Sequence, residues 1–582
     1  MFGIDQTLLI RALNATRQTY FPSYVGLRLI GDQLPPGEND YLQQLIRRRL
    51  GAGDTWRFKR FDLYKGSKQS PQGVEHVYRD CLAPSPLTAI AESLVLTLLA
   101  ANPAFAVSPR VYSYRWPPSS RSGASYEFFG EGYKQRNTEI AAALRVPNHV
   151  AVVTDIKSFY PSARKEQVES ALKSRLDESD GQFRSWSDAI LEFYSQLLIA
   201  GNNGIPVGPA SGHVLGHLIL QDVDRELTSE YGEKYFRYVD DMVVVCHEDQ
   251  ESIVRRDIQR CIEQHGFSLN TDKTIVINNT DWHYNILRAD VADEDNFRSF
   301  TSDLTVYLAF HPDRADSLKK MLAERGLSIP LGRLLALSSY SRFRYFLGRR
   351  KARSGLSHAF GLVLSTNEHF LQRGLRLKSM YESALSALID EPPEASPNLR
   401  RWQVQRARRV INSLFYLRSF SEWSIQRDTF DVLPELVEQL ALADALSSGN
   451  VNPILPFYGR GPAAFSELWA EHGHSNATLS PPETKLNSAE LDGLITLRLY
   501  GMIPADSMQT YSNREDARLL RVVNQTTSMA RTTPDLSFED EFESLRLGTS
   551  DQEVQYLAST RYALSEGTAL EALSLLSSEY RS

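Results

Sequence analysis

The sequence predicts a protein of two parts: a mixed α/β (α+β) region over residues 1–300 and an all-α region over residues 301–582. Up to about residue 300, short runs of β-forming residues alternate with helical patterns. From about residue 305 the strand-like runs nearly vanish, and helical segments follow one another. At 582 residues the chain is too long for one compact core, so at least two domains are expected.

Two segments of the first part have the pattern of buried strands. HVAVVTD, residues 149–155, is an apolar run that ends on Asp155. YFRYVDDMVVVC, residues 235–246, contains two strand-like runs, 235–238 and 242–246, and Asp240 and Asp241 fall at the hairpin between them. The three carboxylates therefore come from the ends of strands.

A helix is predicted between these strands, in PASGHVLGHLILQDVDREL, residues 209–227. Its helical spacing places four apolar side chains on one face: Leu215, Leu218, Ile219 and Val223. Asp222 and Asp224 are expected to be exposed charges on the same helix. His213 and His217 have the i,i+4 spacing of zinc ligands but no third ligand nearby, so a zinc site there is not favoured.

The second part reads as an irregular stack of helix pairs. Segments such as RARRVINSLFYLRSF and LPELVEQLALADALSSG have helical periodicity without a strict repeat length. Asn487 and Glu490 have the spacing of a capping box before LDGLITLRLYG, which predicts a helix start there.

Two adjacent aspartates between apolar runs favour a cationic partner, because two like charges placed together repel each other. Asp155, Asp240 and Asp241 would form an oxygen-rich site for hard divalent cations such as Mg²⁺. A pair of such ions, about 3.5–4 Å apart, stabilises both the attacking and the leaving oxygen in phosphoryl or nucleotidyl transfer. The pattern therefore favours this chemistry.

Composition is that of a folded protein, with 42% hydrophobic and 23% charged residues. The three cysteines, Cys81, Cys246 and Cys261, form no CxxC pair, which argues for a reducing compartment and against a disulfide or zinc framework. No signal peptide is recognised, and no apolar run is long enough to cross a membrane. A cytoplasmic protein without a membrane partner is expected.

Charge is distributed unevenly along the chain, although the net charge is −7. Residues 1–150 hold 18 basic against 12 acidic residues, and the stretch from Arg342 to Lys378 holds nine basic residues and one acid. Such a basic stretch suits a polyanion-binding groove, and an ordinary solvated helix face explains it equally well.

Four motifs in order resemble those of reverse transcriptases. VTDIKSFYPS resembles the first palm motif, GIPVGPASGHVL the second, YVDD the third, and GFSLNTDKT, residues 266–274, the fourth. The resemblance covers about residues 55–280 and implies a right-hand polymerase palm and fingers within residues 1–300. It implies an enzyme, a nucleotidyltransferase acting as an RNA-directed or template-independent DNA polymerase.

Carried over by position, the resemblance assigns catalysis to Asp155, Asp240 and Asp241. It assigns the metal site to these three together with Ile156, for two Mg²⁺ ions with Mn²⁺ as a substitute.

The resemblance also implies five substrate-binding residues. Tyr160, five positions after Asp155, corresponds to the aromatic gate against a ribose 2′-hydroxyl. Gly208 would let the backbone approach the template or nucleotide. Lys273 corresponds to the lysine near the triphosphate, and the weaker fingers resemblance makes Arg79 and Lys65 phosphate contacts.

GIPVGPAS, VYSYRW at residues 111–116 and the long helical C-terminus most resemble bacterial abortive-infection and defence-associated reverse transcriptases. In that family HEAT-like helical repeats replace a conventional thumb, and some members make DNA without a conventional template, attached to their own side chain. The resemblance implies dNTP substrates, a single-stranded DNA product, covalently attached in some members, a homo-oligomer and a role in antiphage defence.

Two other functions stay open. One is an RNA-templated reverse transcriptase of a mobile element, or one with a partner non-coding RNA. The other is a palm that binds nucleic acid without catalysis, against which the intact aspartates count. For a self-primed enzyme the primer hydroxyl is open: the chain has 26 tyrosines, and Tyr20, Tyr24 and Tyr41 lie outside the motifs.

Overall fold

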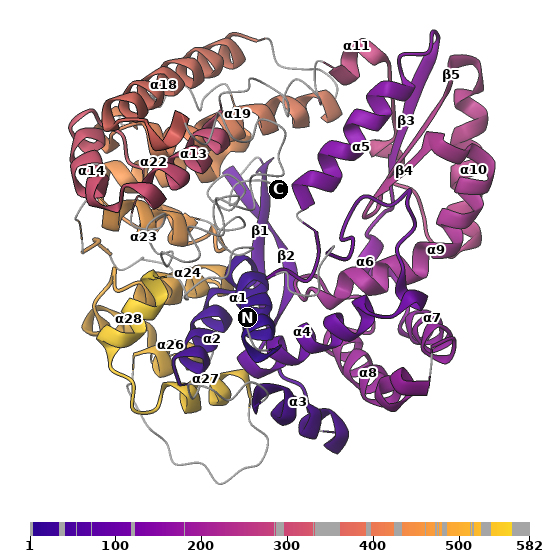
Figure 1. The fold of residues 1–582 in the computed structure, drawn as a ribbon, viewed down its shortest axis with the longest axis horizontal. Coiled ribbons are helices and arrows are strands. Elements are labelled where there is room, and N and C mark those ends of the chain that lie inside the picture. The colour runs from indigo at the N-terminus through magenta and orange to yellow at the C-terminus, as the bar shows by residue number, and fades with distance from the viewer. Residues whose placement is uncertain are drawn as a thin grey trace.

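The structure is a computed structural model of the chain (Figure 1). It describes residues 4–33, 41–53, 55–70, 73–117, 123–127, 129–179, 181–283, 286, 296–329, 331, 361–391, 397–423, 433–459, 461–471, 474, 476–479, 486–512, 514, 517–524 and 537–560.

A four-stranded antiparallel sheet with the order β4-β5-β3-β6 organises the middle of the chain. Its strands are β3 (His149–Asp155), β4 (Tyr235–Tyr238), β5 (Asp241–His247) and β6 (Ile275–Ile277). The strands predicted at 149–155 and on both sides of the aspartate pair are confirmed. The hairpin between β4 and β5 is also where the sequence placed it.

The sheet is covered on both faces, as its alternating side chains require. On one face Val152 and Val244 belong to the main core, with α9 (Ser211–Tyr231) and α10 (Glu251–Gln264) packed over the sheet. On the other face Ala151, Val243 and Val245 join a separate cluster with residues of α5 (Phe129–Ala143). In α9 three of the four predicted core residues are buried, and the fourth, Leu218, is half-buried.

A long antiparallel hairpin, β1 (Phe58–Ser70) and β2 (Gly73–Pro84), stands between the sheet region and the helical half (Figure 1). Among the described residues of the first part, the remaining α-helices are α1 (Ile4–Thr19), α2 (Phe21–Gln33), α3 (Tyr41–Ala52), α4 (Pro86–Ala100), α6 (Phe159–Ser162), α7 (Lys165–Asp177), α8 (Gly181–Ala200) and α11 (Asn279–Trp282).

The second part is helical over its described residues. Its α-helices are α13 (Phe297–Phe310), α14 (Ala315–Glu324), α18 (Asn367–Asp390), α19 (Pro397–Leu417), α20 (Phe420–Trp423), α22 (Val437–Ser448), α23 (Gly461–Glu471), α24 (Ser488–Leu499), α25 (Gln509–Ser512), α26 (Arg518–Val523), α27 (Phe538–Arg546) and α28 (Asp551–Ser559). The capping box predicted for Asn487 and Glu490 is present at the start of α24.

The two ends of the chain pack against each other. Helices α24, α27 and α28 contact α2, and α24 also contacts β1, so the last helices lie beside the first ones (Figure 1). The predicted boundary at residues 300/301 falls inside α13, so the helical part begins no later than Phe297. The division into two domains remains a prediction, since the core is continuous between the two parts.

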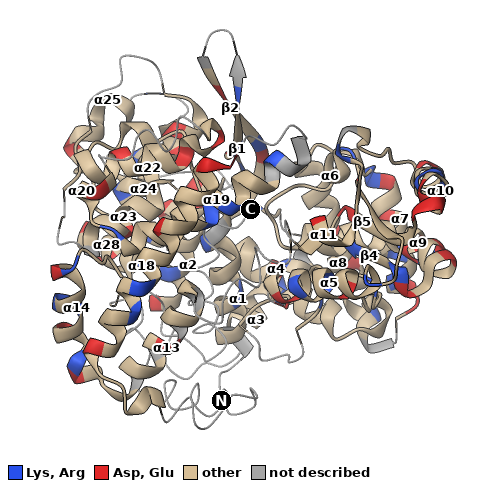
Figure 2. Cartoon of the chain, turned by 90° about the horizontal axis from the view of Figure 1, so that it is seen from above, with Lys and Arg blue, Asp and Glu red and all other residues tan. Residues whose placement is uncertain are grey.

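Basic and acidic residues are interspersed along the ribbon in both halves (Figure 2). Within the predicted basic stretch, Arg373 pairs with Asp303 at 2.8 Å and Lys378 pairs with Glu422 at 2.7 Å, whereas Arg376 is exposed. Residues 342–360 of that stretch lie outside the described residues. None of the described helices has the length and apolar character needed to cross a membrane.

Candidate active site

Three carboxylates meet at one end of the sheet. The antiparallel register pairs Asp155, the last residue of β3, with Asp241, the first residue of β5. Asp240 precedes Asp241 in the hairpin, and one oxygen of each of the three side chains lies within 4.8 Å of the others. The convergence that the sequence predicted is therefore present. The donor set consists of carboxylate oxygens, which suit a hard divalent cation.

The hairpin that presents Asp240 is held in an unusual backbone conformation. Val239 has a φ of 59°, in the left-handed region that a β-branched residue rarely adopts. Its N–H donates to Ser113 Oγ at 2.8 Å, and its carbonyl accepts from Arg237 Nη1 at 2.7 Å. Neighbouring elements therefore impose the turn.

Arg237 is itself anchored in the core. Its Nε and Nη2 donate to the two oxygens of Asp224 on α9, each at 2.6 Å, and both side chains are almost fully buried. The prediction that Asp224 is an exposed helix charge is wrong, because this carboxylate balances a buried guanidinium. Asp222, by contrast, is exposed as expected and pairs with Arg225.

The electrostatics of the site favour a bound cation. Burial, followed by the negative charges of Asp241 and Asp155, raises the pKa of Asp240 to about 7. Lys273 Nζ donates to Asp155 Oδ2 at 2.5 Å, so one cation already lies at the cluster. Divalent ions would neutralise the remaining charge, and the three aspartates fit that role.

Tyr160 lies on α6, the short helix that follows β3. Its hydroxyl hydrogen-bonds His213 Nδ1 at 2.9 Å, and a Cβ at Gly216 would come within 3.3 Å of its ring. Burial lowers the pKa of His213 to about 3, so this imidazole is neutral. His213 therefore acts as a hydrogen-bonding partner of Tyr160, and its helical spacing with His217 needs no metal to explain it.

Tyr114 is a site residue for which sequence reasoning gave no individual role. Its ring stacks on His213 with centroids 3.3 Å apart. Burial, then the charge of Asp240, raises the pKa of Tyr114 to about 12, and Arg79 acts in the opposite direction. The ring thus lies within electrostatic reach of both Asp240 and Arg79. The backbone of Tyr114 has a positive φ of 46°, and no pattern in a single sequence predicts this conformation for a tyrosine.

The backbone at Gly208 lies very close to strand β2 of the same chain, whereas the sequence predicted a close approach to template or nucleotide. A Cβ at this position would lie 2.2 Å from the Leu82 carbonyl oxygen of β2, and the Gly208 φ is +117°. The neighbouring Val207 carbonyl accepts from the Leu82 N–H at 2.8 Å. The glycine is therefore required for docking this loop on the β1–β2 hairpin. Its expected approach to template or nucleotide remains a prediction.

The two fingers cations differ in their relation to the site. Arg79 is exposed on β2, and its charge opposes the rise that burial causes in the pKa values of Tyr114 and Tyr160. Lys65 is exposed on β1 at a break in register between Tyr64 and Gly66. Their phosphate contacts remain predictions.

Ile156, included in the predicted metal set, follows Asp155 directly. Its main chain forms an isolated antiparallel β-bridge with Leu269, and its side chain is buried. Only its main chain could therefore face a metal, and this role also remains a prediction.

One comparison with known proteins, the match to a family model, agrees with this geometry. Residues 118–298 match the family model described as reverse transcriptase (RNA-dependent DNA polymerase). No curated protein matches the chain by sequence. A solved structure of apo telomerase from Candida tropicalis is 12% identical, with 74% of this chain and 71% of that chain covered and a TM-score of 0.25, a likeness too weak to carry an argument.

The matched residues include β3, α9, β4, β5 and β6, and therefore all three aspartates and Lys273. Residues 118–298 are thus similar to a reverse-transcriptase domain, and the match indicates a nucleotidyltransferase, an RNA-directed DNA polymerase.

Proposed function

We propose that the chain is a DNA polymerase that makes single-stranded DNA by two-metal nucleotidyl transfer, in bacterial antiphage defence of the abortive-infection type. The observation that carries the polymerase proposal is the convergence of Asp155, Asp240 and Asp241 within 4.8 Å at the end of the sheet. The defence role is supported by the sequence resemblance alone.

In this proposal each residue at the site has a separate task. Asp155, Asp240 and Asp241 hold two Mg²⁺ ions, which supply charge neutralisation at the α-phosphate and activation of the attacking hydroxyl. Lys273, already beside Asp155, offers a proton to the departing pyrophosphate. Tyr160 blocks a 2′-hydroxyl, and Arg79 neutralises phosphate oxygens.

We further propose that synthesis starts on a hydroxyl of the protein, since a tethered primer gains proximity without a separate binding event. Tyr20 and Tyr24 are poor candidates in this conformation: both are buried, and their hydroxyls hydrogen-bond Asp492 and the Thr560 carbonyl. Tyr41 on α3 is 50% exposed, which makes it the best placed of the three N-terminal candidates.

The proposal is tested by characterising what the purified protein makes from labelled dNTPs and Mg²⁺. DNA should form after nuclease removal of co-purified RNA, should stay attached through denaturation, and should leave a nucleotide on a tyrosine or other hydroxyl residue after protease and nuclease digestion. Tyr41→Phe is the first variant, with Tyr556→Phe, another exposed tyrosine, as the matched control.

The outcomes separate the alternatives. Synthesis that stops on RNA removal and resumes with added RNA would support an RNA-templated enzyme instead. DNA released entirely by denaturant, with strict dependence on an added primer, would overturn self-priming and leave the polymerase assignment standing. Absence of any incorporation under all these conditions would overturn the polymerase proposal itself.

A further inference from the structure

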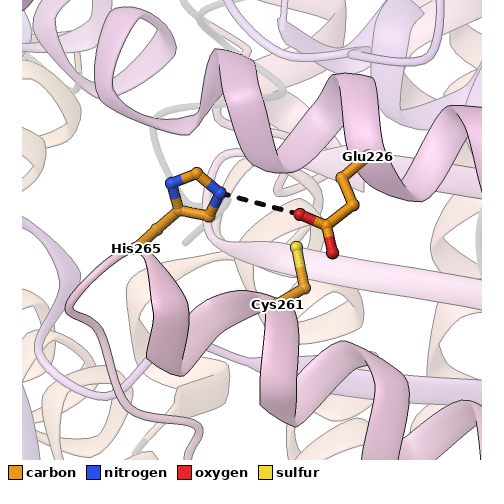
Figure 3. Close-up of side chains that lie close together, drawn as sticks. All are labelled: Glu226, Cys261 and His265. Atoms are coloured by element: carbon orange, nitrogen blue, oxygen red, sulfur yellow. Dashed lines mark ion pairs between the residues drawn. The ribbon is translucent and has the colours of Figure 1, made fainter.

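A second group of metal-binding side chains lies on the palm helices, away from the aspartates. Glu226 comes from α9, Cys261 from the last turns of α10, and His265 caps α10 (Figure 3). One ligand atom from each lies within 4.8 Å of the others. Figure 3 shows the Cys261 sulfur directed toward the space between the imidazole and the carboxylate.

One separation within this group is close to that of a tetrahedral site, and the other two lie within 4.8 Å. With zinc–ligand bonds of about 2.0–2.3 Å, the ligand atoms of such a site are roughly 3.3–3.7 Å apart. His265 Nε2 and Glu226 Oε2 are 3.8 Å apart. Both of these side chains are partly exposed and can adjust by rotation, whereas Cys261 is only 1% exposed. A small inward movement of two side chains would complete the three-ligand set.

We propose that Glu226, Cys261 and His265 form a binding site for a zinc-class divalent ion, with three protein ligands and the fourth position open to water. The sequence argued against zinc because no two cysteines form a CxxC pair, and that argument does not apply to a site with a single cysteine. Here a Cys-x-x-x-His spacing on one helix, which puts both side chains on the same face, is completed by a carboxylate from another helix.

The ligand types distinguish this site from the aspartate cluster. Thiolate and imidazole suit zinc and cobalt, whereas carboxylate oxygens alone suit Mg²⁺. Burial, then the charge of Glu226, raises the pKa of the Cys261 thiol to about 12, so a bound ion must displace a proton to solvent. This proton release opposes binding, and a soft ion with a strong metal–sulfur bond is best able to offset it.

The position of the site suggests a structural role. An ion would fasten the end of α10 to α9, and Phe267 begins the segment that returns to the active-site strand. In that segment Ser268 accepts from the Lys157 N–H at 2.8 Å, and Asn270 donates to the Asp155 carbonyl at 2.7 Å. The proposed site is therefore connected to the main chain of Asp155 by one short segment.

The test uses the full chain, stripped of metal, with Asp240→Asn present throughout to weaken the aspartate site. Titration with Co²⁺ should give one equivalent bound with a sulfur-to-cobalt charge-transfer band, and Zn²⁺ should displace it. Cys261→Ser should lose the band. Cys246→Ser, which alters another buried cysteine outside the group, should keep it.

Glu226→Gln provides a second test that does not depend on altering a buried residue. This exposed change should weaken Zn²⁺ binding at least about tenfold in a chelator competition and reduce the rise in melting temperature on Zn²⁺ addition. Glu230→Gln, on the same helix and also exposed, is its control. An unchanged cobalt band in Cys261→Ser, equal Zn²⁺ affinity in Glu226→Gln and its control, or no Co²⁺ binding by the parent would each overturn the proposal.

Discussion

Tyr160 offers a test of sugar discrimination at the scale of one side chain. Its hydroxyl is held by His213, and its ring packs at Gly216, so the ring has a defined position within electrostatic reach of Asp240. We expect Tyr160→Ala to raise ribonucleotide use relative to deoxynucleotides by roughly tenfold or more, because the steric barrier to a 2′-hydroxyl is removed. Competition between dNTPs and rNTPs measures the ratio.

Tyr160→Phe is the matched control for this prediction. It keeps the ring and removes only the hydrogen bond to His213, so discrimination should persist. If alanine and phenylalanine variants discriminate as well as the parent, Tyr160 does not act as the gate.

Lys273 can be tested in the same way. Because Lys273 Nζ lies 2.5 Å from Asp155 Oδ2, its loss removes both a partner of the Asp155 carboxylate and the proposed proton donor. We expect Lys273→Ala to slow incorporation about 10²-fold or more in single-turnover measurements. Lys173→Ala, an exposed lysine on α7, should leave the rate unchanged. Equal rates for the two variants would show that Lys273 has no role in the chemical step.

At the scale of elements, the hairpin that carries Asp240 depends on the buried pair Arg237–Asp224. Breaking such a pair leaves an uncompensated buried charge, so Asp224→Asn should lower the free energy of unfolding by about 3–5 kcal/mol. Chemical denaturation measures this change. Asp222→Asn on the same helix has an exposed side chain and should change it by less than about 0.5 kcal/mol.

The double variant Arg237→Leu/Asp224→Leu sharpens the same prediction. It removes both charges, so its loss in free energy of unfolding should be smaller than the losses of Arg237→Leu and Asp224→Leu added together. Additive losses would indicate that the two side chains do not depend on each other.

Much of this element was predictable from sequence, and part of it was not. Apolar runs and adjacent acids predicted the strands and the hairpin, because strand periodicity and turn position are local properties. The burial of Asp224 was missed because its partner, Arg237, lies on another element, β4, and helix periodicity within α9 does not show that contact. Ser113 and Tyr114 were missed as individual contributors for the same reason: they act by packing beside β4 and α9.

The Gly208 loop and the Glu226 group show the same limit. The glycine was recognised, but its neighbour, Leu82 on β2, was not, since no local pattern reports which strand will pack on a loop. Cys261 and His265 have a visible helical spacing, whereas the ligand that completes the set comes from α9. Contacts between distant elements therefore account for most of what sequence reasoning did not predict.

At the scale of the whole molecule, the packing of the last helices onto the first ones was not predicted. Tyr20 illustrates it: its hydroxyl donates to Asp492 Oδ1 on α24 at 2.9 Å, in a region where both side chains are buried. Helical periodicity predicted the helices of the second part, but it does not indicate which distant surface each apolar face will cover.

This contact gives a pH-dependent prediction. Burial raises the pKa of Asp492 to about 7, above the ordinary value of 3.8 that applies in the unfolded chain. Between pH 3.8 and about 7 the folded state therefore keeps a proton that the unfolded state has lost. The contribution of Asp492 to the free energy of unfolding falls as pH rises through this window and is gone above about pH 7. Asp492→Asn should thus be stabilised relative to the parent more at pH 8 than at pH 5, by on the order of 2 kcal/mol.

Denaturant unfolding of both proteins at the two pH values measures the difference, and other titrating groups cancel in the comparison. Asp506→Asn, an exposed aspartate in the same half, should show no such change with pH. A stability difference between Asp492→Asn and the parent that is the same at pH 5 and pH 8 would contradict the buried, protonated state inferred for Asp492.

The polymerase assignment depends on three carboxylates brought together from two strands, and the most direct measurement is dNTP incorporation by the purified chain with Mg²⁺. Asp240→Asn should lower incorporation by roughly 10³-fold or more, with an unchanged or higher melting temperature because repulsion between the carboxylates is relieved. Asp222→Asn should match the parent. Undiminished incorporation by folded Asp240→Asn would contradict the central claim.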